Sequence, residues 1–436
     1  MNRRLAFWLC LSLLFVWSIP GTIALRSLLM VGAVLALATA FRPRIGLNAL
    51  RDARLAVWLI GLLTLWLVVQ AVAVSRETAW ALVELRGQWL PALIAFAIGL
   101  LLVRSTSADD GSRLPTAIVL VLGSQAALAV GHSLWHWAMH GELLRQLVPL
   151  TGGKLEMSFV LNLLLAFLTV DLFCRATDRP PLLRLRLPHV LAILAITLGC
   201  GYLAGARNGI LGILFLSFSA VSLYVFDQRR RLGLVRSISA AAAIILSLGA
   251  FALASVWADP RWKTFTETAV VAWDIDHHHT WIDGDLRARP TLPDGRYVEP
   301  SAYLRIAYIH GGLRLIADNP LGTGYGRNAF AHTLKLRHPE AQLGHAHSGW
   351  IDLGIGGGWP ALMLWAALLA SLVAIGWQAF FRRGRAPGLV LFLLSTGYAG
   401  RMVLDSVNKD HMLQMFMFLA GALLMLSREP VAGKPT

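Results

Sequence analysis

Two histidines with one residue between them are the clearest candidates for acid–base chemistry in this sequence. His345 and His347 belong to the stretch GHAHSGWIDLG, which is followed at once by further glycines. A neutral imidazole can take a proton from a hydroxyl group as that hydroxyl attacks. The same spacing can bind a metal ion, but no cysteine and few carboxylates accompany it. We therefore favour a general base over a metal ligand.

Arginines form the second group of candidates. Arg207 lies in the small-residue turn AGARNG between two apolar segments, and Arg305, Arg314 and Arg327 flank the glycine-rich turn NPLGTGYG at 319–326. A planar guanidinium suits bidentate recognition of phosphate oxygens better than an ammonium does. Arg207, Arg305 and Arg314 would form a pyrophosphate clamp if they converge. The alternative for Arg207, which we favour less, is an ordinary interfacial anchor. Any one of the loop arginines taken alone is more often a solvated charge.

Long apolar segments must position these residues. Of 436 residues 56% are hydrophobic and 14% are charged, whereas soluble domains carry about 25% charged residues. A membrane-spanning helix needs about 20 apolar residues. With this criterion we predict an all-α polytopic membrane protein of about twelve transmembrane helices, with the first one retained rather than cleaved. The predicted spans are 5–20, 22–40, 55–74, 88–103, 115–134, 157–174, 188–205, 208–226, 237–257, 358–380, 388–404 and 411–426.

The distribution of basic residues predicts the orientation. The net charge is +15, but the arginines mostly flank apolar segments, which indicates topology rather than nucleic-acid binding. With the N-terminus inside, 21 Lys and Arg fall on the cytoplasmic side and 8 in short loops on the other side. Both termini are therefore expected in the cytoplasm. The three cysteines, Cys10, Cys174 and Cys200, lie in apolar stretches and are expected to be buried and unpaired.

One long polar loop on the non-cytoplasmic side divides the chain. We expect helices 1–9 in residues 1–257, a loop in 258–357 that carries the motifs, and helices 10–12 with a short cytoplasmic tail in 358–436. The loop should contain amphipathic helices near 301–317 and 327–337. Other polar patterns carry less weight, because nucleotide sugars are absent outside the membrane and clustered histidines are usually solvated. These patterns are Asp274/Asp276, Asp283/Asp285, His277–His279, and the row His132, His136 and His140.

The three elements in this order resemble the O-antigen ligase family of the O-antigen ligase/polymerase superfamily. The elements are the turn at Arg207, the block from Arg305 to Gly326, and the His345–His347 stretch with Gly354; together they cover roughly residues 190–360. The family pattern usually reads His-x-His-Asn, whereas this chain has Ser348 after His347.

The resemblance implies a metal-independent, inverting glycosyltransferase of GT-C type without a cofactor, in lipopolysaccharide biosynthesis at a Gram-negative inner membrane. Its donor would be a glycan on undecaprenyl pyrophosphate, and its acceptor a sugar hydroxyl of lipid A–core. No nucleic acid is expected as a partner. By this resemblance the base is His347 or His345. Arg207, Arg305 and Arg314 would bind the pyrophosphate of the donor, and Tyr325, Asn328 and Arg327 are lesser candidates for substrate contacts.

Three alternatives stay open. An O-antigen polymerase shares the donor chemistry, but such enzymes tend to have two substantial periplasmic loops with Arg-x10-Gly repeats, which this chain lacks. A protein O-oligosaccharyltransferase often extends well past its last span, whereas only about ten residues follow Leu426 here. A transporter of lipid-linked sugars typically has an internal repeat and ionisable residues near mid-membrane. In this sequence the candidate residues cluster at the outer face, and the two halves differ in loop architecture. Ligase is favoured over all three.

Overall fold

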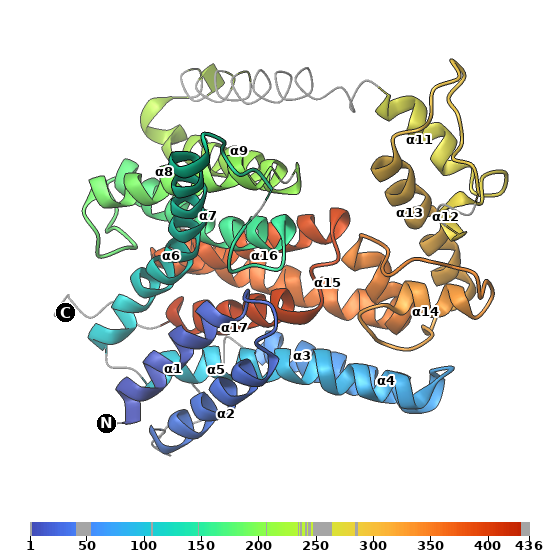
Figure 1. The fold of residues 1–436 in the computed structure, drawn as a ribbon. Helices are drawn as coiled ribbons and strands as arrows, with labels where there is room; N and C mark the ends of the chain where they lie inside the picture. Colours follow the sequence, from blue (N-terminus) through green and yellow to red (C-terminus); the bar gives the residue numbers. More distant parts are fainter. Residues whose placement is uncertain are drawn as a thin grey trace.

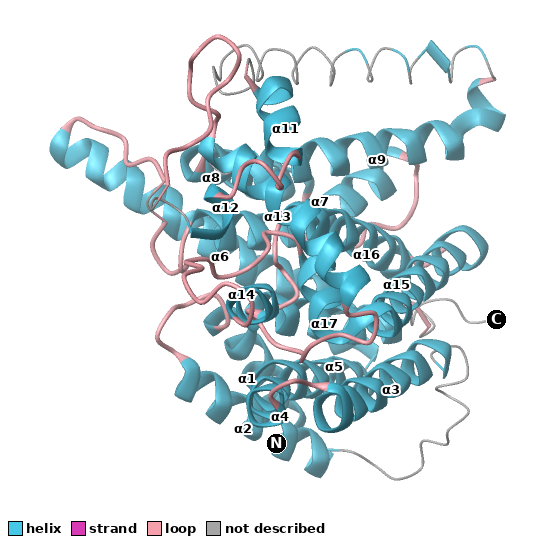
Figure 2. Ribbon diagram, turned by 90° about the vertical axis from the view of Figure 1, so that its right-hand side faces the viewer, coloured by secondary structure: helices cyan, strands magenta, loops and turns pink. Residues whose placement is uncertain are grey.

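The computed structural model is built from helices and turns in the part of the chain that it describes. That part comprises residues 2–40, 54–105, 108–146, 148–205, 207–233, single positions between 235 and 246, 264–283 and 287–428. Figure 2 shows helices and loops throughout. The helices are α1 (Asn2–Val16), α2 (Ile23–Ala40), α3 (Arg54–Val69), the π-helix η2 (Gln70–Val74), α4 (Thr78–Glu84), the π-helix η3 (Leu85–Trp89), α5 (Leu90–Ser105), α6 (Ala108–His140), α7 (Lys154–Ala176), α8 (Leu187–Ala204), α9 (Arg207–Leu232), α11 (Phe265–Trp273), α12 (Thr280–Asp283), α13 (Pro300–Asp318), α14 (Ala329–Lys335), α15 (Gly349–Arg383), α16 (Ala386–Leu404) and α17 (Asp410–Leu426).

Several helices are long and apolar enough to cross a membrane. Seven such stretches occur among the described residues, together with three shorter apolar helices, so the predicted all-α, polytopic class is confirmed. The predicted spans fall on helices, except that most of 237–257 lies outside the described residues. The cysteines are free and buried, as expected.

Two boundaries differ from the prediction. The fourth predicted span, 88–103, lies within a longer helical stretch from Thr78 to Arg104. Arg86, which the charge count assigns to a short loop on the non-cytoplasmic side, therefore lies inside η3. Helix α15 begins at Gly349, within the predicted loop, and a non-helical glycine at 358 divides it (φ 71°). The segment before this kink contains polar residues and glycines, so a criterion based on hydropathy alone places the start of the span at residue 358.

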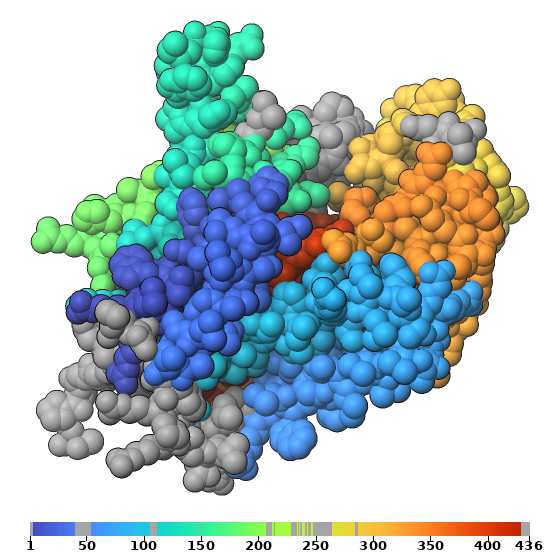
Figure 3. Space-filling model, turned by 60° about the horizontal axis from the view of Figure 1, so that its bottom comes forward, coloured from blue at the N-terminus to red at the C-terminus, as the bar shows by residue number. Residues whose placement is uncertain are grey.

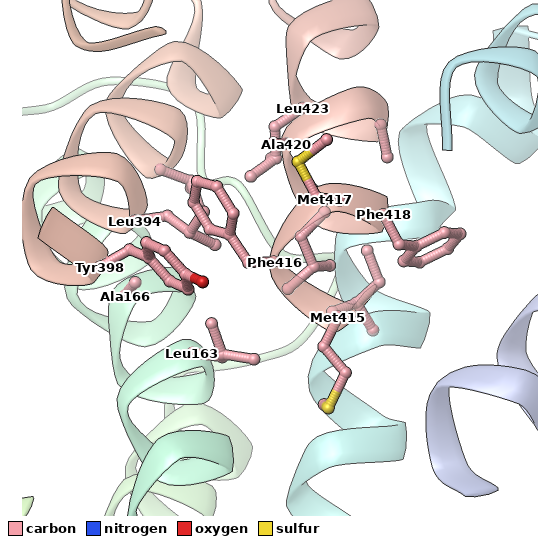
Figure 4. Close-up of a cluster of buried hydrophobic side chains, with 14 of the residues drawn as sticks. Leu163, Ala166, Leu394, Tyr398, Met415, Phe416, Met417, Phe418, Ala420 and Leu423 are labelled. Carbon is pink, nitrogen blue, oxygen red and sulfur yellow. The ribbon is translucent and has the colours of Figure 1, made fainter. Parts of the chain in front are cut away.

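The last helix, α17, forms the centre of the bundle. Its residues from Met412 to Leu426 are buried, and Figure 4 shows Leu163, Leu394 and Tyr398 around Phe416. The α5–α17 crossing depends on small residues. A Cβ atom on Gly99 would lie 2.1 Å from the carbonyl oxygen of Phe418. Close backbone approach of this kind is how membrane helices associate when lipid offers no hydrophobic driving force.

The segment α11–α14 lies at one end of the bundle, opposite the ends of the chain (Figure 1). It has its own core, in which Trp281, Tyr308 and Phe330 pack with Ile351 and Ile355 of α15. Its helices at 300–318 and 329–335 confirm the two predicted amphipathic helices, within a few residues. In Figure 3 the red C-terminal part of the chain is visible in a hollow between the blue N-terminal helices and the orange segment.

Candidate functional site

The histidine stretch precedes the first turn of α15 and has an unusual backbone. His347 adopts φ 52°, a left-handed conformation that is costly for residues with a Cβ atom. Its ring lies parallel to that of Tyr308, with centroids 6.1 Å apart. The rings of His345 and His347 have centroids 4.4 Å apart, so the structure brings the two candidate bases together. Non-glycine residues in such conformations cluster at functional sites.

A buried carboxylate holds this stretch in place. Asp352, in the first turn of α15, accepts a hydrogen bond from the amide of Ala346 at 3.0 Å. Its other oxygen accepts a hydrogen bond from the Ser406 hydroxyl at 2.5 Å. The backbone amide of Gly349 donates to the carbonyl of Asp405 at 3.1 Å. The loop between α16 and α17 therefore holds the segment that follows the histidines in place.

Cations next to the histidines favour their neutral form. Burial, followed by the charge of Lys409 and more weakly that of Arg305, lowers the pKa of His345 to about 3. Burial and Arg305 also lower the pKa of His347, but the carboxylate of Asp405 opposes that change. Both imidazoles are therefore uncharged at neutral pH and can accept a proton. The carboxylate of Asp405 thus favours proton binding by His347, whereas the contributions to the pKa of His345 are burial and neighbouring positive charge.

The glycine-rich turn is interlocked with the kink of α15. The amide of Thr323 donates to the carbonyl of Ile355 at 2.9 Å, and the amide of Trp359 donates to that of Pro320 at 2.9 Å. A Cβ atom on Gly322, which has φ 84°, would lie 2.4 Å from the carbonyl oxygen of Gly356. The two glycine motifs are therefore in direct backbone contact. This contact fixes the position of the first half of α15 and hence of Asp352.

The end of this turn and the residues that follow it line a small cavity shared with Asp352. Tyr325 is buried, which raises the pKa of its hydroxyl, and its amide donates to Gln70 in η2 at 3.3 Å. Arg327 pairs with Glu84 at 3.2 Å and with Asp410 at 3.4 Å. A small cavity of about 10 Å³ joins Tyr325, Gly326 and Arg327 to Asp352 and Lys409; Gln88, Leu353 and Asn408 complete its lining. Asn328 is exposed at the start of α14.

The predicted arginines have different surroundings. Arg305 of α13 lies close enough to both histidines for its charge to lower their pKa values. Arg314 points elsewhere and forms a two-pronged ion pair with Asp276, with contacts of 2.5 and 2.8 Å. Arg207 is the first residue of α9, but its side chain lies outside the described part of the structure. Of the three predicted pyrophosphate ligands, the described side chains thus bring one to the histidines.

A buried arginine lies beside a larger apolar cavity. The cavity, of about 240 Å³, is enclosed by α7, α9 and α16 and lined by Phe159, Phe215, Leu393 and other apolar side chains, with Asn162 and Arg401. Arg401 is 7% exposed. One of its nitrogens donates to the carbonyl of Leu155 at 2.8 Å and pairs with Asp405 at 3.2 Å. Its Nε and Nη1 atoms have no hydrogen-bond partner in the described part of the chain.

Reasoning from the sequence missed four of these groups: Asp352, Arg401, Asp405 and Lys409. One signal was present, because the polar run DSVNKD at 405–410 interrupts two apolar helices. Charged residues next to or within membrane helices are functional candidates by default. The other polar patterns stay apart from the site: His277 pairs with Asp274 at 2.9 Å, and the described residues contain no cluster of metal-ligand type.

Comparison with known proteins identifies the part of the chain that carries this site. No curated protein matches the chain. Residues 192–366 match a family model described as O-antigen ligase. The matched segment contains the turn at Arg207, Arg305, the interlocked glycines, both histidines and Asp352, and it ends before Arg401. The predicted resemblance is thereby confirmed: across residues 192–366 the chain carries a domain of the O-antigen ligase family, whose members are glycan-transferring membrane enzymes.

Proposed function

We propose that this protein is an O-antigen ligase that transfers a glycan from undecaprenyl pyrophosphate to a sugar hydroxyl of lipid A–core. The transfer is inverting and metal-independent, and it takes place at the periplasmic face of a Gram-negative inner membrane. The enzyme is of GT-C type, with about twelve transmembrane helices and both termini in the cytoplasm. One observation carries the proposal: the imidazole rings of His345 and His347 lie 4.4 Å apart on the segment that matches the ligase family, within the electrostatic influence of Arg305 and Lys409.

A base and two cations have separate roles in the proposed reaction. His347 accepts the proton of the acceptor hydroxyl while the hydroxyl oxygen attacks the anomeric carbon of the donor glycan. The bond between that carbon and the pyrophosphate oxygen breaks, and undecaprenyl pyrophosphate leaves with the electron pair. A pyrophosphate leaving group needs positive charge more than it needs an acid, and Arg305 and Lys409 supply it. Because Arg314 is held by Asp276, we replace it by Lys409 in this role and retain Arg207.

The apolar cavity next to Arg401 has room for the isoprene units nearest the pyrophosphate, and the rest of the polyprenyl chain stays in the bilayer. That cavity lies beneath the start of α9, where Arg207 begins the helix, and its lining is almost wholly apolar. The polyprenyl chain exchanges contacts with lipid for contacts with this apolar lining, while its phosphates stay near the guanidinium groups at the membrane surface. Tyr325, Arg327 and Asn328 lie on the side of the site toward α4 and are candidates for sugar contacts.

The test uses purified protein, undecaprenyl-pyrophosphate-linked glycan and lipid A–core in the presence of EDTA, with joined lipopolysaccharide detected on a gel. We expect His347→Ala to lose product by 10²-fold or more, roughly the contribution of a general base, and Arg207→Ala and Arg305→Ala to lose it as well. His338→Ala and Arg314→Ala are matched controls that should retain activity.

The same assay separates the alternatives. Elongation of the glycan on its own carrier, without joined product, would make the protein a polymerase and leave the site assignment standing. Transfer to a protein acceptor would make it an oligosaccharyltransferase. Movement of the donor across vesicles without any transfer would favour a transporter. Full activity of Arg305→Ala, or loss of activity with EDTA, would overturn the mechanism.

A further inference from the structure

The apolar cavity between α7, α9 and α16 has one polar end. Along α16 its lining runs from Leu393 to Leu404, which corresponds to about 16 Å of helix. Arg401 lines the cavity one turn before the end of α16. Among the described residues, the other polar side chains of the lining are Asn162 and Tyr398, whose hydroxyl is already hydrogen-bonded. The cavity is therefore suited to an amphiphile with a polar group at one end.

Arg401 uses only part of its hydrogen-bonding capacity. One nitrogen, Nη2, donates to the carbonyl of Leu155 at 2.8 Å and to the hydroxyl of Ser158 at 2.7 Å, and it pairs with Asp405 at 3.2 Å. A guanidinium carries five N–H groups, one on Nε and two on each Nη. Those on Nε and Nη1 lack a partner within the described ranges, although the side chain is only 7% exposed. Buried donors without partners are unfavourable, so these groups indicate a ligand.

The cavity opens on the surface of the bundle between α9 and α16. Phe215 and Leu404 line it and are 36% and 38% exposed. Gly400 also lines it and is exposed, and a Cβ atom added to Gly400 would have no neighbour within 4 Å in the part of the chain that the structure describes. A lipid chain can therefore enter sideways from the bilayer, at the end of the cavity where Arg401 lies.

Asp405 connects this end of the cavity to the histidines. Its carboxylate pairs with Arg401, and its charge also acts on His347. Asp405 and, more weakly, Glu156 offset part of the positive charge of Arg401, so this end of the cavity favours a singly charged group over a polyanion. In a pyrophosphate that links a lipid to a sugar, the phosphate next to the lipid carries a single negative charge.

We propose that the polyprenyl end of the donor enters this cavity between α9 and α16, beside Gly400, and that Arg401 donates hydrogen bonds to the phosphate nearest the lipid. The proposal rests on the proposed function and deepens it, because Arg401 lies outside the segment that matches the family model. The second phosphate and the glycan extend past Asp405 toward His347. Since these contacts involve no sugar, the glycan-free product, undecaprenyl pyrophosphate, occupies the same site and competes with the donor.

The test measures binding of undecaprenyl pyrophosphate to the full chain in detergent by native mass spectrometry, so its outcome does not depend on glycan transfer. Arg401→Lys keeps a cation for Asp405 but removes the N–H groups of Nε and Nη1. It should weaken binding about tenfold or more, the equivalent of one charge-assisted hydrogen bond. Binding of the uncharged alcohol undecaprenol should be unchanged. Thermal unfolding checks that the variant is folded.

Gly400→Leu is the second variant, because its side chain has room at the mouth of the cavity. It should weaken binding of both lipids and raise the KM for the donor, with the KM for lipid A–core unchanged. Gly61→Leu on α3 is the matched control, since Gly61 is also exposed and a Cβ atom there also meets nothing within 4 Å among the described residues. It should leave binding and both KM values unchanged.

Three results would overturn the proposal: wild-type binding of undecaprenyl pyrophosphate by folded Arg401→Lys, equal effects of the two glycine variants, or displacement of undecaprenyl pyrophosphate by an equal concentration of phosphatidylglycerol. Binding that follows the expected pattern without any glycan transfer would support this site and count against the proposed function alone.

Discussion

Asp352 offers the sharpest test of how the site is held together, because it supports the histidines without contacting either ring. Its two oxygens accept hydrogen bonds from the buried amide of Ala346 and from the hydroxyl of Ser406. Hydrogen bonds to a charged group contribute about 1.5–3 kcal/mol each. Asp352→Ala therefore removes about 3–6 kcal/mol of local stabilisation and leaves a buried N–H unpaired.

The expected consequence is a misplaced base rather than an unfolded chain. A displacement of about 1 Å in a reacting group can cost about 100-fold in rate. We expect Asp352→Ala to lower kcat by about that factor, with the KM for the donor nearly unchanged. Asp352→Asn should lose less than about tenfold, because its oxygen can still accept from Ala346 while its amide donates to Ser406. Rates are measured in proteoliposomes, and folding is checked by thermal unfolding in detergent.

Asp318→Ala is the matched control, since Asp318 is exposed and forms an ion pair with Arg337 at 2.8 Å, away from the histidines. A folded Asp352→Ala protein with wild-type kcat would refute the argument that this carboxylate positions the histidines. An Asn variant as slow as the Ala variant would refute it too, because the negative charge rather than the two hydrogen bonds would then be what matters.

Four further outcomes follow from the geometry. His347→Asn should keep Tm, because asparagine tolerates the left-handed conformation, but lose 10²-fold or more in ligation rate; the same change at His345 should cost less, and equal losses would contradict the choice of base. The acid limb of the kcat/KM profile should lie below pH 6.5, since the histidine pKa values are lowered; a limb at or above 6.5 would refute this. Gly322→Ala should lower Tm strongly, because its Cβ meets backbone at 2.4 Å, as a thermal scan would show. Glu84→Gln, which removes the charge of the buried partner of Arg327, should lower Tm by a smaller amount, and an unchanged Tm would show that the pair is not structural.

The sequence predicted the fold class well because hydropathy and charge act along the chain. Apolar runs locate helices wherever burial in lipid dominates, so each predicted span falls on a helix in the described residues. Hydropathy fails where the reason for a helix is tertiary. The first turns of α15 carry glycines and Asp352, yet they are helical because the glycine turn at 320–324 hydrogen-bonds to them. No local pattern records that contact.

The site was predictable in its motifs but not in its partners. His345, His347 and Arg305 stood out by type and position, and the structure brings them together. Arg314 looked equivalent to Arg305 on the sequence, but it lies against Asp276 because nine residues along a helix do not return to the same face. Lys409 was counted only as a topological charge, since its approach to His345 depends on the packing of α17 at the centre of the bundle.

The lowered pKa values of His345 and His347 raise a question of mechanism, because a base with a low pKa is a weak one. Its resolution lies in the donor. The cations that lower the pKa of His345 and His347 are the groups proposed to hold the pyrophosphate, and a bound pyrophosphate brings negative charge that offsets them. Donor binding therefore raises the pKa of the base toward the working pH, where general base catalysis is most effective.

Without donor, the pKa values of His345 and His347 stay low, so both imidazoles are neutral before the donor binds. This order of events has a measurable sign. The acid limb of kcat, which reports the enzyme with donor bound, should lie at a higher pH than the acid limb of kcat/KM for the donor, which reports the free enzyme. In Arg305→Gln the difference in pH between the two acid limbs should narrow. The variant lacks one of the positive charges that lower the histidine pKa values in the free enzyme, so donor binding has less lowering to offset. Coincident limbs in the wild type would mean that the cations act on the leaving group alone.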